Sequence, residues 1–204
     1  KINKKLIIPK GEYKIDSDLY IPKGYEFIVE AGTILDITQN SKIISESMIA
    51  LIGSENNPII IHSSDKLGQC IIVKNSSKLS LIKNVYFKNL SNCSSPNMEL
   101  SGSINFYNSN VKISNSNFYE NIKGDDYVNI VNSNFNISDI IFNRAKYDAI
   151  DIDYSNGDIN NIFSIDTGND VLDLSNSIVK LSNFNSNNAL DKAISIGERS
   201  KLYA

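Results

Sequence analysis

Apolar and polar residues alternate along most of this chain, in short runs separated by polar turns. Five segments share one layout, and their starts differ by 24, 22, 22 and 22 positions: INFYNSNVKISNSNF from 104, VNIVNSNFNISDIIF from 128, IDIDYSNGDINNIFS from 150, LDLSNSIVKLSNFNS from 172 and ISIGERSKLYA from 194. Each has an apolar-x-apolar pair, a polar turn, a second such pair and usually a third apolar position. Because β-strand side chains alternate between two faces, the layout predicts three short strands per repeat.

The repeated positions form columns when the segments are aligned. The first pair is Ile104/Phe106, Val128/Ile130, Ile150/Ile152, Leu172/Leu174 and Ile194/Ile196. The second pair is Val111/Ile113, Phe135/Ile137 and Val179/Leu181, and Gly157/Ile159 breaks the rule at its first member. The turn between the pairs carries a serine column, Ser109, Ser133, Ser155 and Ser177, and beside it Asn108, Asn132 and Asn176. We expect the amides to form hydrogen bonds from one repeat to the next.

A fixed period in the twenties with β-type alternation is typical of a β-solenoid, in which each coil stacks on the last. We predict an all-β, right-handed, single-stranded parallel β-helix of about nine coils of roughly 22 residues. Helical solenoids need apolar spacing of about 3.6 residues, and leucine-rich repeats need a Leu/Asn frame, neither of which is present. An antiparallel sandwich is the alternative, but it does not require repetition in register.

The chain is predicted to be one domain, 1–204, belonging to a longer protein. Residues 1–64 form irregular N-terminal coils, in which LIIPKGEYKI and LYIPKGYEFIVEAGTILDI repeat a strand, a Pro-Lys-Gly turn and a strand. Residues 65–103 form coils with an inserted loop, SNCSSPNMELSGS, at 91–103, and 104–204 form the regular coils. The chain stops at SKLYA within an apolar coil, so we expect further chain or another subunit to cover the C-terminal coil.

Two stretches carry a family resemblance. LYIPKGYEFIVEAGTILDI followed by MIALIGSENNPIIIHSS resembles the opening coils of right-handed parallel β-helix proteins of the pectate-lyase-like superfamily. The coils DAIDID, GNDVLDLSNS and DKAISIGERS resemble secreted bacterial β-helix domains encoded beside spore-coat-type protein kinases. The resemblance implies a secreted or cell-surface protein, and it implies fold more than activity, because this fold carries lyases, hydrolases, epimerases, adhesins and scaffolds.

Charge and composition exclude two classes of partner. Twenty basic and 23 acidic residues give a net charge of −3, so there is no basic stripe for a nucleic acid. No stretch approaches about eighteen uninterrupted apolar residues, so no membrane span is expected. The only cysteines, Cys70 and Cys93, are too few for a metal site. They are either small buried side chains or a disulfide between neighbouring turns.

Acidic residues recur at the repeat spacing. Two positions before the first strand the column is Asp126, Asp148, Asp170 and Lys192, and on the outward face it is Asn129, Asp151, Asp173 and Ser195. Residues one coil apart stack at about 4.8 Å, the spacing of parallel strands. Two carboxylates at that distance repel by about 1 kcal/mol in water and about 4 kcal/mol at an intermediate dielectric. Something must offset that repulsion.

Three explanations fit this acidic face. Corner aspartates cap backbone amides in turns. Alternatively, Asp148, Asp151, Asp170 and Asp173 bind Ca²⁺, which takes six to eight oxygens; otherwise the protein has no cofactor. In the third, Asp148 and Asp170 are catalytic, because stacked coils supply the carboxyl separation of a retaining glycosidase. The resemblance to pectate-type lyases implies instead an Arg or Lys as the base, for which Lys192 is a candidate. The residues predicted to bind a ligand are Asp126, Asp151, Asp153, Asp173, Tyr147 and Tyr154.

Other residues have ordinary explanations. The only histidine, His62, is expected at a strand end with a polar partner, and Arg144 is expected to form a surface ion pair with Asp166. The resemblance implies catalytic motifs that are missing, apart from GDD at 124–126, which echoes the polygalacturonase-type hydrolases. Two functions fit the chain. One is a non-catalytic scaffold, adhesin or glycan-binding module, and the other is a polysaccharide lyase or glycoside hydrolase acting on an acidic polysaccharide along the Asp-rich face.

Overall fold

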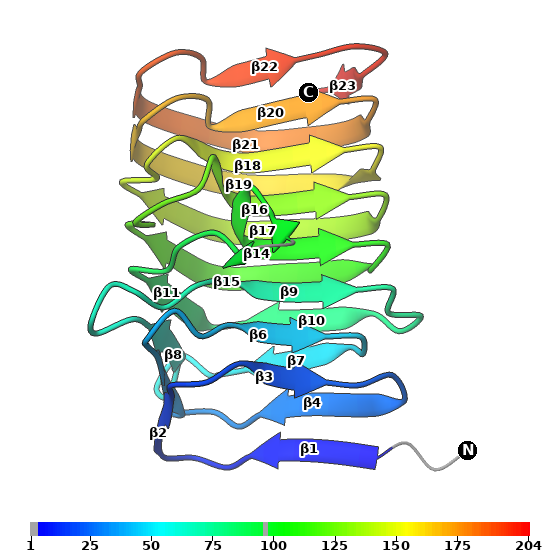
Figure 1. Ribbon diagram of the computed structural model, residues 1–204. Coiled ribbons are helices and arrows are strands. Elements are labelled where there is room, and N and C mark those ends of the chain that lie inside the picture. Colours follow the sequence, from blue (N-terminus) through cyan, green and yellow to red (C-terminus); the bar gives the residue numbers. More distant parts are fainter. Residues whose placement is uncertain (1–3, 96–97) are drawn as a thin grey trace.

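The computed structural model describes residues 4–95 and 98–204, and these residues form strands without any helix. The chain rises through nine stacked coils, from β1 at the N-terminal end to β22 and β23 at the C-terminal end (Figure 1). Strands of successive coils always pair in parallel within the described residues. The predicted parallel β-solenoid of about nine coils is therefore confirmed.

One side of the solenoid is a sheet of eight strands, one from each coil after the first. In axial order they are β3 (Leu19–Ile21), β6 (Ile43–Ser45), β9 (Ile71–Lys74), β14 (Gly102–Tyr107), β16 (Asp126–Val131), β18 (Asp148–Asp153), β20 (Leu172–Ser175) and β22 (Ile194–Ile196). The members of each apolar pair face the interior, where side chains such as Ile104 and Phe106 are fully buried.

The other two sides belong to one sheet of thirteen strands. Its first arm is β1 (Lys4–Ile8), β4 (Tyr25–Val29), β7 (Ile49–Ile52) and β10 (Ser80–Lys83). Its second arm is β2 (Glu12–Ile15), β5 (Ile34–Ile37), β8 (Ile59–His62) and β11 (Val85–Lys88). Both arms join on β15 (Val111–Tyr119), which is followed by β17 (Asn134–Asn143), β19 (Asn156–Thr167), β21 (Ile178–Ala189) and β23 (Lys201–Tyr203). In four successive coils, the predicted second and third strands are one continuous strand. These strands are β15, β17, β19 and β21.

A short antiparallel hairpin interrupts this plan. It consists of β12 (Ser94–Ser95) and β13 (Met98–Glu99), within the insertion predicted at 91–103; residues 96 and 97 of that prediction lie outside the described residues. The hairpin projects from the eight-stranded sheet beside β14 and β16 (Figure 1). β9 pairs directly with β14 across the insertion, with Ile71 opposite Ile104. The insertion is accommodated outside the stack.

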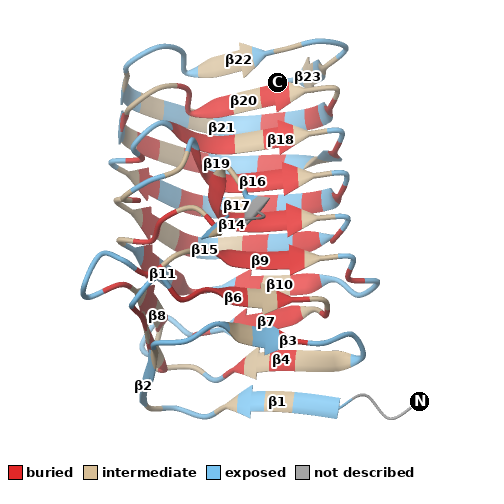
Figure 2. Ribbon diagram, in the orientation of Figure 1, coloured by how far each residue is buried: buried red, intermediate tan, exposed pale blue. Residues whose placement is uncertain are grey.

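The core is a continuous apolar column inside the coils (Figure 2). Phe87, Phe118 and Phe142 stack along the axis, with centroid separations of 5.1 and 4.7 Å. The Tyr127 ring lies edge-on to Phe118 at 5.4 Å, and its hydroxyl donates to the Tyr119 carbonyl. Tyr127 is therefore a core residue.

The corners of the coils use left-handed backbone, which turns the chain within one residue. Three columns have φ between 40° and 60°: Asn75, Asn108, Asn132, Tyr154, Asn176 and Arg199; Asn84, Asn115, Asp139, Asn161 and Asn183; and Asn89, Glu120 and Arg144 with Asp166. Most members are Asn or Asp, the residues that tolerate this conformation at least cost after glycine. The abundance of Asn is thus a consequence of the corners.

The serine column also joins the coils. The amides of Ser109, Ser133 and Ser155 each donate to the hydroxyl of the serine one coil further on, at 2.8–3.0 Å. Beside it, the Asn108 amide donates to Asn75 and the Asn132 amide to Asn108, as predicted. Tyr154 then interrupts the amide ladder. The serine contacts satisfy buried backbone amides at these turns, whereas the asparagine contacts join exposed side chains.

Candidate functional site

The acidic residues lie on the eight-stranded sheet, where β14, β16, β18 and β20 are adjacent. Asp126 is opposite Asp148, Asn129 is opposite Asp151, and Asp151 is opposite Asp173. The stacking predicted from the 22-residue spacing is confirmed for these pairs. We call the outward surface formed by Asn105, Tyr107, Asp126, Asn129, Asp148, Asp151, Asp153, Asp170 and Asp173 the acidic face.

Two of its aspartates join successive coils. Asp148 Oδ1 accepts the Asp170 amide at 2.8 Å and the Asn169 side chain at 2.7 Å, and Asp170 Oδ1 accepts the Lys192 amide at 2.7 Å. Both carboxyls are buried, with 6% and 4% exposure. Burial raises the pKa of Asp148 to about 6, against the lowering effect of its two hydrogen bonds. These contacts match the capping explanation.

The Lys192 side chain belongs to a different pair. Its Nζ contacts Asp191, next to it in sequence, and both side chains are exposed. The hydrogen bond that Lys192 donates to Asp191 raises the pKa of Lys192, and the charge of Asp170 adds to this shift. The catalytic role predicted for Asp148, Asp170 and Lys192 thus stays a prediction, and the contacts of all three are structural.

Asp151 is the most strongly perturbed acid of the face. Its Oδ2 accepts the Asn129 amide at 2.9 Å. Burial raises its pKa to about 9, with further contributions from the negative charges of Asp126, Asp153 and Asp173. Burial, followed by the charge of Asp173, also raises the pKa of Asp153. The negative charges around Asp151 therefore favour its protonated form near neutral pH unless a cation offsets them.

Asp126 is the least accessible aspartate of the acidic face, at 2% exposure. Burial raises its pKa to about 7, a hydrogen bond from Ser101 opposes the shift, and the charges of Asp125 and Asp148 add to it. Tyr107 is in the same environment, because burial and the charge of Asp126 raise the pKa of its phenol to about 12. Asp126, Tyr107 and Ser101 therefore lie together.

The inserted hairpin covers this end of the acidic face. Cys70 and Cys93 form a disulfide, which decides between the two states left open by the sequence. Both cysteines are fully buried with Ile72, and Leu100 and Tyr107 pack against them. The Asp126 amide donates to Ser101 O at 3.2 Å. The disulfide therefore holds the segment that covers Asp126.

The two predicted tyrosine ligands are on the surface but not on the acidic face itself. Tyr147, 46% exposed, lines a shallow hollow beside the hairpin with Glu99, Lys123 and Asp125. Tyr154, 62% exposed, occupies a left-handed corner after β18. Among residues 4–95 and 98–204, no three acidic, histidine or cysteine side chains converge as a metal-binding group. Calcium bound by Asp148, Asp151, Asp170 and Asp173 remains a prediction.

A second surface, which the sequence reasoning did not identify, lies on the thirteen-stranded sheet. We call it the aromatic groove, of about 410 Å³, and it is lined by Ile34, Ile60, His62, Tyr86, Lys88, Tyr119 and Arg144. Ile34, Ile60 and Tyr86 form one outward column, while His62, Lys88 and Tyr119 form the next. The rings of Tyr86 and Tyr119 are 6.4 Å apart and nearly perpendicular.

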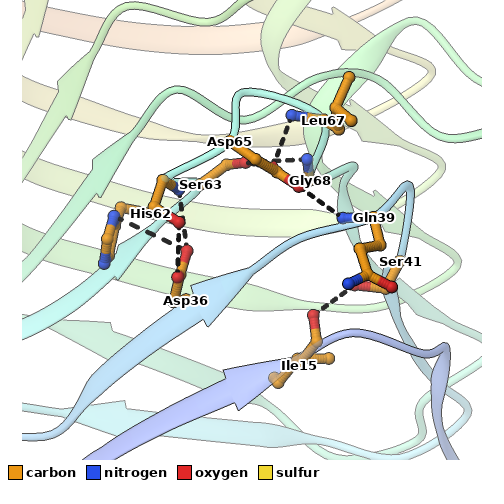
Figure 3. Close-up of polar contacts among 10 residues, drawn as sticks. Ile15, Asp36, Gln39, Ser41, His62, Ser63, Asp65, Leu67 and Gly68 are labelled. Carbon is orange, nitrogen blue, oxygen red and sulfur yellow. Dashed lines mark hydrogen bonds and ion pairs between the residues drawn. The ribbon is translucent and has the colours of Figure 1, made fainter.

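Polar contacts fix one end of the aromatic groove. His62 Nδ1 lies 4.0 Å from Asp36 Oδ1, and Asp36 also accepts hydrogen bonds from Ser64 (Figure 3). His62 therefore has the strand-end position and polar partner that the sequence predicts. Near the other end, Arg144 pairs with Glu120 at 3.0 Å, so the predicted pair with Asp166 is wrong. All three residues share one corner column, and Arg144 extends toward the preceding coil.

In comparisons with known proteins, no family model and no curated protein matches the chain. Among solved structures, the catalytic unit of a thermostable GH87 α-1,3-glucanase from Streptomyces thermodiastaticus strain HF3-3 aligns with 98% of this chain at 9% identity and a TM-score of 0.29. The aligned part spans 63% of that structure. A likeness at this level carries no argument about function. In the described part of the chain, no helix is long and apolar enough to cross a membrane.

Proposed function

We propose that this chain is a non-catalytic, carbohydrate-binding β-helix module of a secreted or cell-surface protein. The aromatic groove is the observation that carries the proposal. Two tyrosine rings at about a right angle offer apolar faces to sugar C–H groups, and His62, Lys88 and Arg144 offer hydrogen-bond donors around them. Its volume, about 410 Å³, is within the range of about 300–1,000 Å³ for small-ligand sites.

The contacts of the acidic face support a binding role over a catalytic one. Asp148 and Asp170, the acids first expected to react, direct an oxygen to amides of the next coil and are buried. A general acid must be within hydrogen-bond reach of its substrate. The disulfide supports the secreted or surface location, because disulfides persist in oxidising compartments.

A glycan array followed by calorimetric titration of the glycan that binds tests the proposal. Tyr86→Ala and Tyr119→Ala should each weaken binding about two- to tenfold, since an aromatic contact contributes about 0.5–1.5 kcal/mol. Tyr20→Ala is the matched control, because Tyr20 is 52% exposed and lies on the other sheet. If no glycan binds, or if Tyr86→Ala and Tyr119→Ala bind as the parent protein does, the proposal is wrong.

One observation favours hydrolysis as a second candidate. Asp151 stacks on Asp173 in adjacent strands, and burial raises the pKa of Asp151 to about 9. A protonated acid about 5 Å from a second carboxyl is the arrangement of retaining glycosidases. Asp151→Asn and Asp173→Asn would then abolish release of reducing sugar from a polysaccharide. Under the binding proposal, both variants bind glycan normally and the parent protein releases no sugar.

A further inference from the structure

Buried oxygen atoms without partners are concentrated under the inserted hairpin. Asn105 Oδ1, Asp126 Oδ2 and Asn129 Oδ1 have no hydrogen-bond partner among the described residues. Asn105, Asp126 and Asn129 are 0–2% exposed. Buried oxygens of this kind destabilise a fold unless something unseen satisfies them. They lie on β14 and β16, next to each other in the sheet.

Asn105 and Asn129 approach Gly102 more closely than any residue with a side chain would allow. Asn105 is opposite Asn129, and Gly102 is opposite Asp126. The Asn105 amide donates to Gly102 O at 2.7 Å, so it folds over that residue. A Cβ on Gly102 would be 2.7 Å from Asn105 Oδ1 and 2.9 Å from Asn129 Cβ. Any other residue at position 102 would displace the Asn105 and Asn129 side chains from this arrangement.

A second carboxylate contacts the same group of side chains. The Asn129 side-chain amide donates a hydrogen bond to Asp151 Oδ2 at 2.9 Å, while Asn129 Oδ1 has no partner among the described residues. Within the described residues, no Lys, Arg or His forms an ion pair with any aspartate of the acidic face. No direct ion pair with a protein cation therefore offsets the repulsion between the stacked carboxylates.

We infer that Asp126, Asn129, Asn105 and Asp151 form a binding site for Ca²⁺ beneath the hairpin. All donors are oxygens, two from carboxylates and two from amides, and water completes the six to eight ligands that Ca²⁺ takes. Zn²⁺ prefers nitrogen and sulfur, and Mg²⁺ demands stricter octahedral geometry. The site differs from the one predicted from the sequence, because Asp148 and Asp170 already direct an oxygen to backbone amides.

The role of such an ion is structural. It joins β14, β16 and β18 and neutralises the carboxylates next to the segment held by the disulfide. It is independent of the aromatic groove, which lies on the other sheet.

Calorimetric titration of the full chain with CaCl₂ at pH 8, after EDTA and dialysis, tests the inference. We expect one Ca²⁺ per chain and a melting temperature that rises with Ca²⁺ and falls again with EDTA. Asp126→Asn should fold, since it loses only a buried charge, and should bind Ca²⁺ at least tenfold more weakly. Asp158→Asn, an exposed position on β19, is the control and should bind as the parent does.

Three results would overturn the inference. The first is no binding heat at millimolar Ca²⁺, and the second is equal binding by the parent protein and Asp126→Asn. In the third, Ca²⁺ leaves the melting temperature unchanged while acidification alone raises it. That result would show that protons, and no metal ion, offset the negative charge of the stacked carboxylates. Glycan binding by the aromatic groove, measured in EDTA, should persist in Asp126→Asn, so failure of the ion site and failure of the proposed function are separate outcomes.

Discussion

The Phe135 ring and backbone occupy the space that a side chain at Gly157 would need. The two residues are opposite each other in β17 and β19, and a Cβ on Gly157 would be 2.2 Å from Phe135 O and 2.6 Å from Phe135 Cδ2. The repeat has Val111 and Val179 at the same offset. Gly157 therefore breaks the apolar pattern because the backbone carbonyl and the ring of Phe135 leave no room for a side chain.

Restoring the repeat pattern at this position should destabilise the protein. Gly157→Val forces a side chain into a filled site, which costs about 1–3 kcal/mol. Urea denaturation measures the change. Gly11→Ala is the control, because a Cβ there meets only the Tyr13 side chain, at 3.1 Å. Adding Phe135→Val should recover part of the loss, since it removes the ring contact and leaves the carbonyl contact. A more stable Gly157→Val variant would contradict this explanation.

The acidic face should make stability depend on pH in metal-free buffer. Folding raises the pKa of Asp148 to about 6, of Asp126 to about 7 and of Asp151 to about 9. Groups with raised pKa values stabilise the fold while protonated, so the free energy of unfolding should fall as pH rises from about 4 to about 9. The Asp126 shift alone corresponds to on the order of 4 kcal/mol.

Neutral variants separate this effect from the charge of the whole protein. Asp126→Asn and Asp151→Asn should flatten the pH profile, whereas Asp158→Asn should leave its shape unchanged. Chemical denaturation at pH 5, 7 and 9 in EDTA provides the profile. A parent protein with equal stability at all three pH values would show that the buried carboxyls are solvated or paired differently.

The disulfide should contribute measurably to stability. Cys70 and Cys93 are 23 positions apart. Closing a loop of this length lowers the entropy of the unfolded chain, which stabilises the folded protein by about 3 kcal/mol at 25 °C. Urea denaturation with and without dithiothreitol measures the loss. Limited proteolysis should cut the 91–103 insertion faster after reduction, and the register of the coils should persist. Unchanged stability in reductant would show that the covered segment is held by packing alone.

The serine column should be sensitive at each of its members. Ser155 Oγ accepts the Ser133 amide at 3.0 Å and donates to Asp153 O at 2.7 Å, and the residue is buried. Ser155→Ala leaves a buried amide without an acceptor, at a cost of about 1–3 kcal/mol. Ser77→Ala, an exposed corner residue, is the matched control and should change stability by less than about 0.5 kcal/mol. Equal melting temperatures for both variants would show that water replaces the hydroxyl.

The fold and the stacking of the acids follow from the sequence because coil length fixes register. A period of 22 residues places Asp151 under Asp173 wherever no residue is inserted, as the structure confirms. The sequence does not reveal the aromatic groove, because the insertion separates Lys88 from its axial neighbour Tyr119 by 31 positions. The alternation around Phe87 and Phe118 was the available signal, since it places Tyr86 and Tyr119 outward.

Contacts that depend on side-chain direction were harder to predict. Arg144 has an acid in the coil before it and another in the coil after it, and spacing alone does not choose between Glu120 and Asp166. Likewise, spacing brings Asp148 next to Asp170, but only the structure shows that Asp148 reaches the amide of Asp170. Repetition predicts which residues are neighbours, whereas the backbone at the corner decides which groups meet.

The direct pairing of β9 with β14 across a long insertion separates two tasks of the chain. The hydrogen bonds between coils depend only on the strand residues, so the corners can accept inserted residues without disturbing them. New recognition elements can therefore be added at any corner without redesigning the stack, and each added segment gains a rigid base. In this architecture, the evolution of new surface chemistry is largely decoupled from the maintenance of the fold.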